Sequence, residues 1–305
     1  MATPHFIQKK LQLLKQEYDT LRVGKDSLIQ ILDESEIPEN VYNSNAIENS
    51  TLTLKETEKI LLELEVSRDV SLREVFEAKN LARVTEYIRS KFEKTEMSKN
   101  FALLLHRMLM GGINDGIAGM LRKKGEYVRV GTYIAPPPEH VEKMIDRILV
   151  EYSSDFSTFF LDKIAKFHLD FERIHPFVDG NGRIGRVLIN WQFMSLGCPY
   201  VIIRNKDKKY YYRAFTEYND AKKTKTMERT LGLALIESFH KRIAYLKGER
   251  ITTVADYARK NKKSASAMLN AARRQTIPAF REKGVWKMGE VRSEVKGATV
   301  LSSLK

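Results

Sequence analysis

Residues 175–186, with the sequence HPFVDGNGRIGR, constrain the fold of this chain more than any other stretch. Apolar residues at helical spacing lead into this stretch over residues 167–174 and out of it over residues 187–194. Pro176 cannot continue a helix, and a residue that precedes proline avoids the α region, so the chain must turn at His175. The sequence therefore predicts two helices joined by a short loop rich in polar side chains.

The glycines and arginines of this loop suit the binding of phosphate groups. Gly180, Gly182 and Gly185 permit a close backbone approach, and successive N–H groups at the start of the second helix form an anion site. Arg183 and Arg186 lie three residues apart, which places them on roughly the same helix face. Because a guanidinium binds phosphate oxygens in a bidentate way, we expect both arginines to contact a nucleotide.

One carboxylate and one imidazole supply the remaining chemistry. Asp179 is the only acidic residue of the loop, and Mg²⁺ is commonly held by one or two protein carboxylates together with substrate phosphates. An imidazole such as that of His175 suits a general base for an incoming hydroxyl. No Gly-Lys-Ser/Thr follows the glycines and His-Glu-x-x-His is absent, which excludes a Walker loop and a zincin site.

The loop resembles the signature of the Fic family, HPFx[D/E]GNGRxxR, and fills every fixed position of it. Residues 119–122 and 128–131 resemble the segment that leads into the family's β-hairpin flap, and residues 135–139 resemble the stretch after the flap. Residues 211–215 resemble a helix that follows the family's core. The resemblance covers residues 40–245, so it implies a Fic-type helical bundle with a small flap.

The resemblance also implies an activity, which is transfer of AMP from ATP to a Tyr, Ser or Thr hydroxyl of a protein. His175 would be the catalytic base, and Asp179 would hold Mg²⁺. The nucleotide contacts implied are those of Gly180, Asn181 and Gly182 with the α- and β-phosphates, Arg183 with the β-phosphate and Arg186 with the γ-phosphate. The target-docking flap would be the backbone of Val130, Gly131, Thr132 and Tyr133, to which the target adds a strand.

Residues 44–49, with the sequence SNAIEN, fit the family's inhibitory motif [S/T]xxxE[G/N]. Such a hexad turns up by chance in roughly a quarter of chains of this length, given ordinary composition. The alternative is a helix start with Asn45 as N-cap and Glu48 reaching back to it. The position before the catalytic core favours inhibition, with Ser44, Glu48 and Asn49 as its residues. We expect Glu48 to pair with Arg186 and to block the γ-phosphate side.

Helical periodicity dominates the rest of the chain and predicts an all-α fold. We expect helices over residues 6–32, 54–66, 75–92, 101–110, 141–152, 156–173 and 212–219, and a strand-turn-strand over residues 127–134 with Gly131 at its tip. The expected domains are an N-terminal helical segment (1–40), the Fic core (41–245), a C-terminal module (250–290) and a tail (291–305). Four histidines are expected to be packing or surface residues, although His168 could orient the site: His106, His140, His168 and His240.

Composition points to an ordinary soluble globular protein. Hydrophobic residues make up 43% and charged residues 30% of the chain, and the mean hydropathy is −0.38. No window approaches a membrane span, and residues 1–18 lack the apolar core of a secretory leader. Cys198 is the only cysteine, which excludes an intramolecular disulfide. We therefore expect a cytoplasmic location.

Residues 251–290 form a basic segment with nine Lys or Arg and three Asp or Glu, a net charge of 9 − 3 = +6 of the chain's +13. Helices over residues 253–258 and 264–274, the second capped by Ser264 or Ser266, and strands over residues 277–281 and 285–288 resemble a winged helix-turn-helix module of the excisionase kind. Residues 264–274 would then be the recognition helix, with Arg273 and Arg274 on DNA. Protein contact or dimerisation is the alternative use.

Two functions from different classes fit these features. The first is a Mg²⁺- and ATP-dependent protein adenylyltransferase, inhibited in cis by Glu48, whose partners are a protein substrate and, through automodification, the chain itself. The second is a DNA-binding regulator or toxin–antitoxin-like switch that uses the Fic site to sense nucleotide. The complete set of His175, Asp179 and the arginines favours the enzyme.

Overall fold

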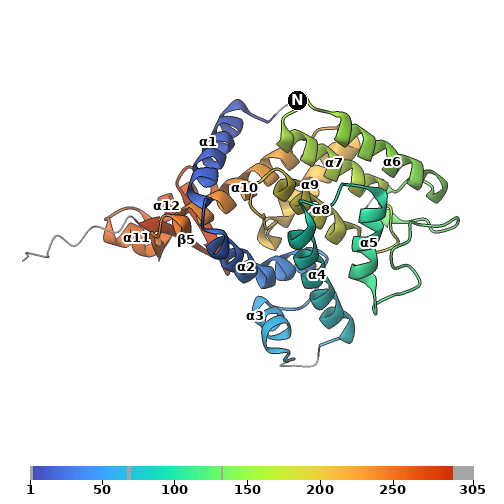
Figure 1. Ribbon diagram of the computed structural model, residues 1–305, viewed down its shortest axis with the longest axis horizontal. Helices are drawn as coiled ribbons and strands as arrows, with labels where there is room; N and C mark the ends of the chain where they lie inside the picture. Colours follow the sequence, from blue (N-terminus) through green and yellow to red (C-terminus); the bar gives the residue numbers. More distant parts are fainter. Residues whose placement is uncertain (1–2, 67–69, 132, 291–305) are drawn as a thin grey trace, which may run out of the picture.

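The computed structural model describes residues 3–66, 70–131 and 133–290. Figure 1 shows a helical bundle, with the C-terminal module at one end beside α1 and the hairpin flap on the opposite side. The helices are α1 (His5–Arg22), α2 (Asp26–Ile47), α3 (Leu54–Glu58), a π-helical turn (Lys59–Glu63), α4 (Leu72–Lys91), α5 (Lys99–Met110), α6 (Pro138–Ser154), α7 (Phe160–Ile174), α8 (Asn181–Ser195), a 3₁₀ turn (Asn205–Asp207), α9 (Lys208–Ala221), α10 (Lys225–Leu246), α11 (Val254–Lys260) and α12 (Ala265–Arg273). The strands are β1 (Arg129–Val130), β2 (Tyr133–Ile134), β3 (Arg250–Thr253), β4 (Ala279–Glu282) and β5 (Val285–Glu290).

Helices α7 and α8 lie between two apolar clusters and contribute to both. Phe171 and Leu188 belong to the cluster that α4, α5 and α6 complete. Leu169 and Phe193 belong to the second cluster, which α1, α9 and α10 complete. Burial of apolar surface on both sides of this pair fixes the two helices, and with them the loop that joins them.

The predicted all-α fold with one short hairpin flap is confirmed, but the N-terminal part differs from the prediction. The expected helix over residues 6–32 is wrong because Gly24, with a φ of +71°, ends α1 and lets the chain turn into α2. The alternative of a helix start at Asn45 is also wrong, since α2 ends at Ile47. The proposed boundary between residues 40 and 41 falls inside α2.

The flap is a small exposed hairpin. Strands β1 and β2 pair antiparallel, with Val130 opposite Tyr133, and Gly131 turns between them with a φ of +60°. Thr132, which the sequence assigns to target docking, lies outside the described residues.

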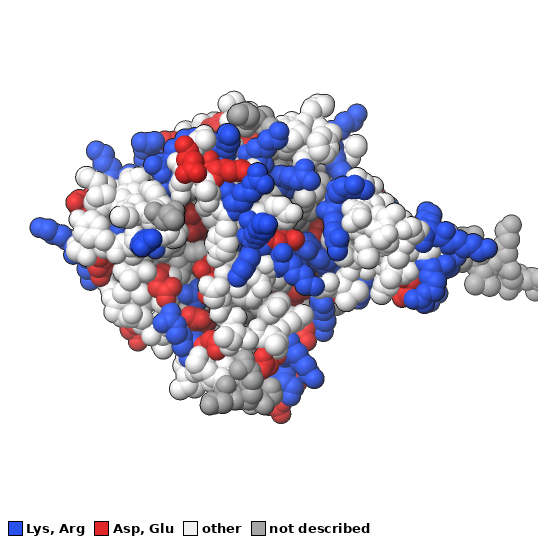
Figure 2. All heavy atoms as spheres, turned by 180° about the vertical axis from the view of Figure 1, so that it is seen from behind, with Lys and Arg blue, Asp and Glu red and all other residues white. Residues whose placement is uncertain are grey.

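The C-terminal module contains an antiparallel sheet in the order β3-β5-β4, together with α11 and α12. Ser264 caps α12 by accepting a hydrogen bond from the Ala267 amide. Strand β3 was not predicted, and the assignment to winged helix-turn-helix modules stays a prediction. Figure 2 shows Lys and Arg side chains gathered at the outer end of the module. Arg259, Lys260 and Lys263 are among the exposed basic residues of the module. Among the described residues, no helix is long and apolar enough to cross a membrane.

Candidate active site

The loop between α7 and α8 begins and ends at two residues with left-handed backbone conformation. His175 caps α7 with a φ of +51°, and Gly180 precedes α8 with a φ of +81°. The first hydrogen bond within α8 runs from the Ile184 amide to the Gly180 carbonyl, 3.0 Å away. The amides of residues 181–183 therefore precede the hydrogen bonds of the helix itself and can bind an anion.

The protonation state of His175 leaves one ring nitrogen able to accept a proton. Its Nδ1 lies 3.3 Å from the Glu172 carbonyl oxygen, which can only accept, so Nδ1 carries the proton and Nε2 keeps its lone pair. Burial lowers the pKa of His175, and this effect exceeds the raising effect of its hydrogen bond to the Glu172 carbonyl; the positive charge of Arg122 adds a smaller lowering. The neutral imidazole is thus favoured at neutral pH.

The loop is braced from within by Asn181. Its side-chain oxygen accepts a hydrogen bond from the Phe177 amide, and its side-chain nitrogen donates to the Phe177 carbonyl, both at 2.9 Å. Because the side chain is buried and its oxygen and one of its N–H groups bond to the loop backbone, we expect Asn181 to contact a phosphate through its backbone amide.

His106 on α5 supports the loop from outside, a role that the sequence did not predict. Its ring stacks on Phe177 with a centroid distance of 3.8 Å. The Gly119 amide donates to Nδ1, so Nε2 carries the proton and donates to the Asp179 carbonyl at 3.0 Å. Burial lowers the pKa of His106 to about 4, which keeps this hydrogen-bonding pattern fixed at neutral pH.

Arg122 ties the loop to the segment that leads into the flap. Its side chain is buried and donates to four backbone carbonyls, those of Glu126, Pro136, Ile174 and His175. Its own amide donates to the Pro176 carbonyl at 2.9 Å. One guanidinium therefore fixes the backbone at His175 relative to both ends of the flap segment. The sequence resemblance marked residues 119–122 but gave Arg122 no such role.

Asp179 lies within a network of two arginines and a second carboxylate. Its oxygens lie 2.6 Å from Arg73 Nη2 and 3.2 Å from Arg183 Nη2. Glu77 on α4 completes the network by pairing with Arg73 at 3.0 Å and with Arg183 at 3.1 Å. Despite the opposing effect of burial, the pKa of Asp179 is lowered, mainly by the charge of Arg183, so its carboxylate is ionised at neutral pH. Arg73 and Glu77 were not predicted from the sequence.

Arg186 is directed toward α2 rather than toward the partners of Arg183. Its Nη2 lies 2.9 Å from Glu48 Oε1, and the same guanidinium donates to the hydroxyl and the carbonyl of Ser44. Its side chain is only 5% exposed. The Glu48 carboxylate lies directly over Gly182, where a Cβ would overlap it. The loop and the hexad at residues 44–49 therefore meet across 138 residues of sequence.

Comparison with known proteins identifies the fold and the loop. Residues 96–193 match the sequence profile of the Fic/DOC family. This chain contains a Fic domain. A Fic-domain signalling protein from Bacteroides thetaiotaomicron is 24% identical, with a TM-score of 0.71 over 79% of this chain and 98% of that one. A Fic family protein from Desulfovibrio desulfuricans is 20% identical, with a TM-score of 0.63 over 96% of this chain and 98% of that one.

Relatives of known activity match only part of their own length. The protein adenylyltransferase Fic of Drosophila willistoni is 30% identical over 177 residues, which make up 57% of this chain. This chain spans 35% of the length of that relative. The similarity therefore concerns the Fic domain and its immediate surroundings.

A partly buried acid and a buried histidine form the wall behind Arg186 in this Fic domain. Glu172 Oε1 and His168 lie against Gly185, where a Cβ would overlap the Glu172 carboxylate. His168 Nε2 lies 2.7 Å from the Tyr211 hydroxyl, and burial lowers the pKa of His168 to about 3. Burial, assisted by the charge of Glu48, raises the pKa of Glu172 to about 8. His168 thus lies close to the site, but it contacts Tyr211 and not His175.

Glu172 predicts how the stability of the Fic domain depends on pH. The folded protein keeps the Glu172 proton up to about pH 8, whereas the unfolded chain loses it near the ordinary carboxyl pKa of 4.5. The folded state therefore loses stability between these two values. We expect Glu172→Gln to gain stability relative to the parent between pH 5 and pH 8, by on the order of a few kcal/mol.

Urea unfolding of both proteins at pH 5 and pH 8 measures this difference. The matched control is Glu142→Gln on α6, whose side chain is 67% exposed and which should follow the parent at both pH values. If the free energies of unfolding of Glu172→Gln and the parent differ by the same amount at pH 5 and at pH 8, Glu172 is ionised in the folded state.

Proposed function

We propose that this chain transfers AMP from ATP to a hydroxyl side chain of a protein. The observation that carries the proposal is the arrangement at the α7–α8 loop, where the unprotonated Nε2 of His175 precedes a helix N-terminus with free amides and two buried arginines. The curated relatives named protein adenylyltransferase support the same chemistry.

In the proposed reaction His175 accepts the proton of a Tyr, Ser or Thr hydroxyl. The hydroxyl oxygen then forms a bond to the α-phosphorus while the bond between that phosphorus and the bridging oxygen of the β-phosphate breaks. Pyrophosphate leaves, and AMP remains on the target. We assign the α- and β-phosphates to the backbone amides of Gly180, Asn181 and Gly182, of which the Gly180 amide donates to Asp179 Oδ1 at 2.6 Å before nucleotide binds.

The same residues suit a nucleotide carried by Mg²⁺. Among the described residues no group of three or more His, Cys, Asp or Glu side chains could hold a metal ion by itself. Asp179 is a single, partly exposed carboxylate, which fits Mg²⁺ bound mainly by phosphates and water. Bound there, the ion would neutralise phosphate charge. Arg73, with 57% of its side chain exposed, can leave Asp179 to admit it.

We further propose that Glu48 inhibits this reaction in cis. Its carboxylate holds Arg186, the residue assigned to the γ-phosphate, and lies over Gly182 at the start of α8. A negatively charged phosphate cannot share this space with the carboxylate. Tyr212 on α9 donates to the Ile47 carbonyl at 2.9 Å and so helps to hold the end of α2 in place.

The flap is proposed to align the target by backbone pairing. The outer edge of a two-stranded hairpin offers unpaired N–H and C=O groups, to which an extended peptide can add a strand. Val130 and Ile134 are exposed on it, and Tyr133 is partly buried beside Arg173. A target recognised mainly by its main chain need not have a particular sequence around the modified hydroxyl.

A pair of labelled nucleotides tests the reaction class. We expect the Glu48→Gly variant, incubated with Mg²⁺ and a cell lysate, to incorporate label from ATP labelled on the α-phosphate. ATP labelled on the γ-phosphate should give no label beyond that of the lysate alone, because that phosphate departs in pyrophosphate. Additional γ label that depends on the variant would instead establish phosphoryl transfer. The rival function, a DNA-binding regulator that only senses ATP, predicts incorporation of neither label.

A further inference from the structure

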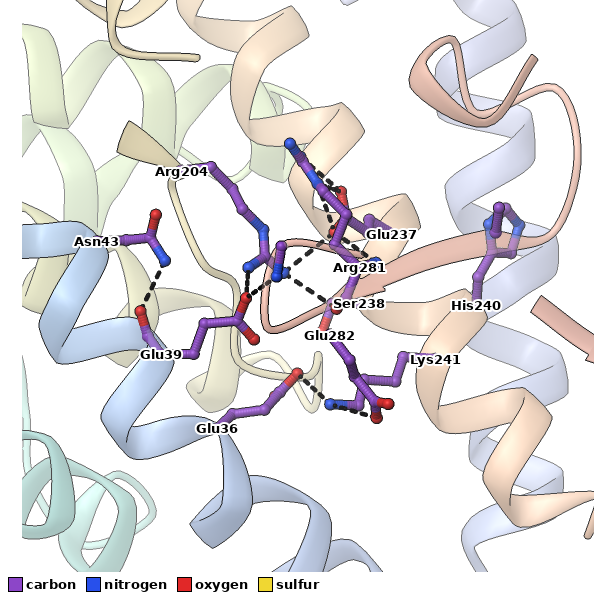
Figure 3. Close-up of polar contacts among 12 residues, drawn as sticks. Glu36, Glu39, Asn43, Arg204, Glu237, Ser238, His240, Lys241, Arg281 and Glu282 are labelled. Carbon is purple, nitrogen blue, oxygen red and sulfur yellow. Dashed lines mark hydrogen bonds and ion pairs between the residues drawn. The ribbon is translucent and has the colours of Figure 1, made fainter. Parts of the chain in front are cut away.

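The hairpin β4–β5 of the C-terminal module packs against α2 and α10 through buried charged side chains (Figure 3). We call this group the interdomain cluster. Its members are Glu36 and Glu39 on α2, Arg204 before α9, Glu237 and Lys241 on α10, and Arg281 and Glu282 on β4. Each of these side chains is 17% exposed or less. The hairpin thus contacts the helix that carries the inhibitory motif.

Arg281 attaches the module to α10. Its guanidinium lies 2.8 Å from Glu237 Oε2, and its backbone amide donates to Glu237 Oε1 at 3.0 Å. Its Nη1 also pairs with Asp207 at 2.9 Å. Burial works against the ionised carboxylate of Glu237, but the charges of Arg204 and Arg281 outweigh it and lower the pKa of Glu237.

Glu39 attaches α2 to the same hairpin. Its carboxylate accepts hydrogen bonds from Arg204 and, at 3.1 Å, from the Gly284 amide in the β4–β5 turn. Arg204 in turn donates to Glu237 and to the Arg281 carbonyl, both at 3.2 Å. One arginine therefore joins α2, α10 and the module.

A second connection runs through Lys241. Its Nζ lies 3.1 Å from both Glu36 on α2 and Glu282 on β4. Removal of the hairpin would leave Lys241 without Glu282, Glu237 without Arg281 and Glu39 without the Gly284 amide. Each of the three keeps one charged partner outside the hairpin, Glu36 for Lys241 and Arg204 for both glutamates, but loses part of the polar contacts that stabilise its buried charge. The position of α2 therefore depends on the docked module.

Glu39, which contacts the module, and Glu48, which contacts Arg186, lie on the same part of α2. Pro38 interrupts the hydrogen bonding of α2, but Glu39, Ser44 and Glu48 all follow it. Glu48, the C-cap of α2, lies nine positions after Glu39, or about 13 Å along the helix. The same turn also reaches the segment after the motif, since Lys283 pairs with Glu58 on α3 at 2.9 Å. The hairpin therefore contacts the chain on both sides of residues 44–49.

We infer that the C-terminal module holds α2 in the position that places Glu48 on Arg186, so that undocking the hairpin relieves inhibition. The inference rests on the proposed function for its catalytic readout. Its structural content, the coupling of hairpin and helix, is independent of that function.

The experiment compares Arg281→Ala and the isosteric Glu39→Gln with the parent, each in the full chain. Hydrogen exchange of the amides of residues 40–48 reports the position of α2. Transfer of label from α-labelled ATP reports inhibition. We expect faster exchange over residues 40–48 in both variants, and transfer raised by about tenfold over the parent. Arg259→Ala is the matched control, because this arginine of the same module is 82% exposed and pairs with Asp256 alone among the described residues.

Faster exchange in the module with no change over residues 40–48 would overturn the inference. Unchanged transfer in both variants would overturn it as well, provided that Glu48→Gly is active in the same assay. Absence of transfer even in Glu48→Gly would instead refute the proposed function, and the exchange data would still decide whether the hairpin holds α2. If Arg281→Ala does not fold, the isosteric Glu39→Gln variant still tests the inference.

Discussion

Replacement of Glu48 by glycine should raise AMP transfer by on the order of a hundredfold or more. The substitution removes the carboxylate that lies 2.9 Å from Arg186 Nη2 and clears the space over Gly182. Arg186 is buried, but 37% of the Glu48 side chain is exposed, so solvent screening lowers the contribution of the pair below that of a fully buried one, to about 2–3 kcal/mol. A difference of about 1.4 kcal/mol corresponds to a tenfold change in rate. The measurement is the initial rate of label incorporation from α-labelled ATP at saturating nucleotide.

The matched control is Glu65→Gly, another glutamate outside the regular helices, which pairs with Lys59 and has 62% of its side chain exposed. It should transfer AMP at the parental rate. Ser44→Ala offers a graded comparison, since it removes one hydrogen bond to Arg186 and leaves the Ser44 carbonyl and Glu48 in place. Equal rates for Glu48→Gly and the parent would show that the ion pair does not limit the reaction.

Replacement of His175 by alanine in the Glu48→Gly protein should lower transfer by roughly a hundredfold to ten-thousandfold, the usual contribution of a general base. Binding of ATP should persist, because the amides of α8 and both arginines remain. The pH dependence of the transfer rate also has an expected direction. A base with a lowered pKa stays unprotonated at neutral pH, so the rate in the Glu48→Gly protein should fall only as the pH drops below the ordinary histidine value.

His140→Ala controls for the removal of an imidazole, because His140 is exposed on α6. It should leave both nucleotide binding and transfer intact. Retention of full transfer by the His175→Ala protein would assign the proton to another acceptor. Loss of ATP binding together with transfer would show that His175 mainly shapes the loop.

Local sequence predicted the α7–α8 loop well because its determinants are local. Pro176 and the glycines define where the chain turns, and the helices on either side have clear apolar periodicity. The pairing of Glu48 with Arg186 was reached in another way, through the resemblance of residues 44–49 to a family motif. No property of Arg186 itself indicates a partner 138 residues away.

The parts that sequence reasoning missed depend on tertiary contacts. Arg73, Glu77 and Arg122 act through loop atoms that are distant in sequence, and each is by itself an ordinary charged residue. Helix α10 was not predicted because it is buried on most sides. Its apolar residues therefore do not lie along one face at the spacing of a surface helix. Its Glu237 and Lys241 are charged but buried, and they are tolerated there because each pairs with one residue of the module and one residue outside it.

The contacts of Arg122 also say how new target preferences can arise in such a chain. The guanidinium binds carbonyl oxygens, which every residue type possesses, and it leaves the side chains of the flap segment unconstrained. Mutations there can accumulate without disturbing the backbone that holds the imidazole. Under the proposed function, selection can therefore explore different target proteins while the chemistry stays constant, provided that this one arginine is kept.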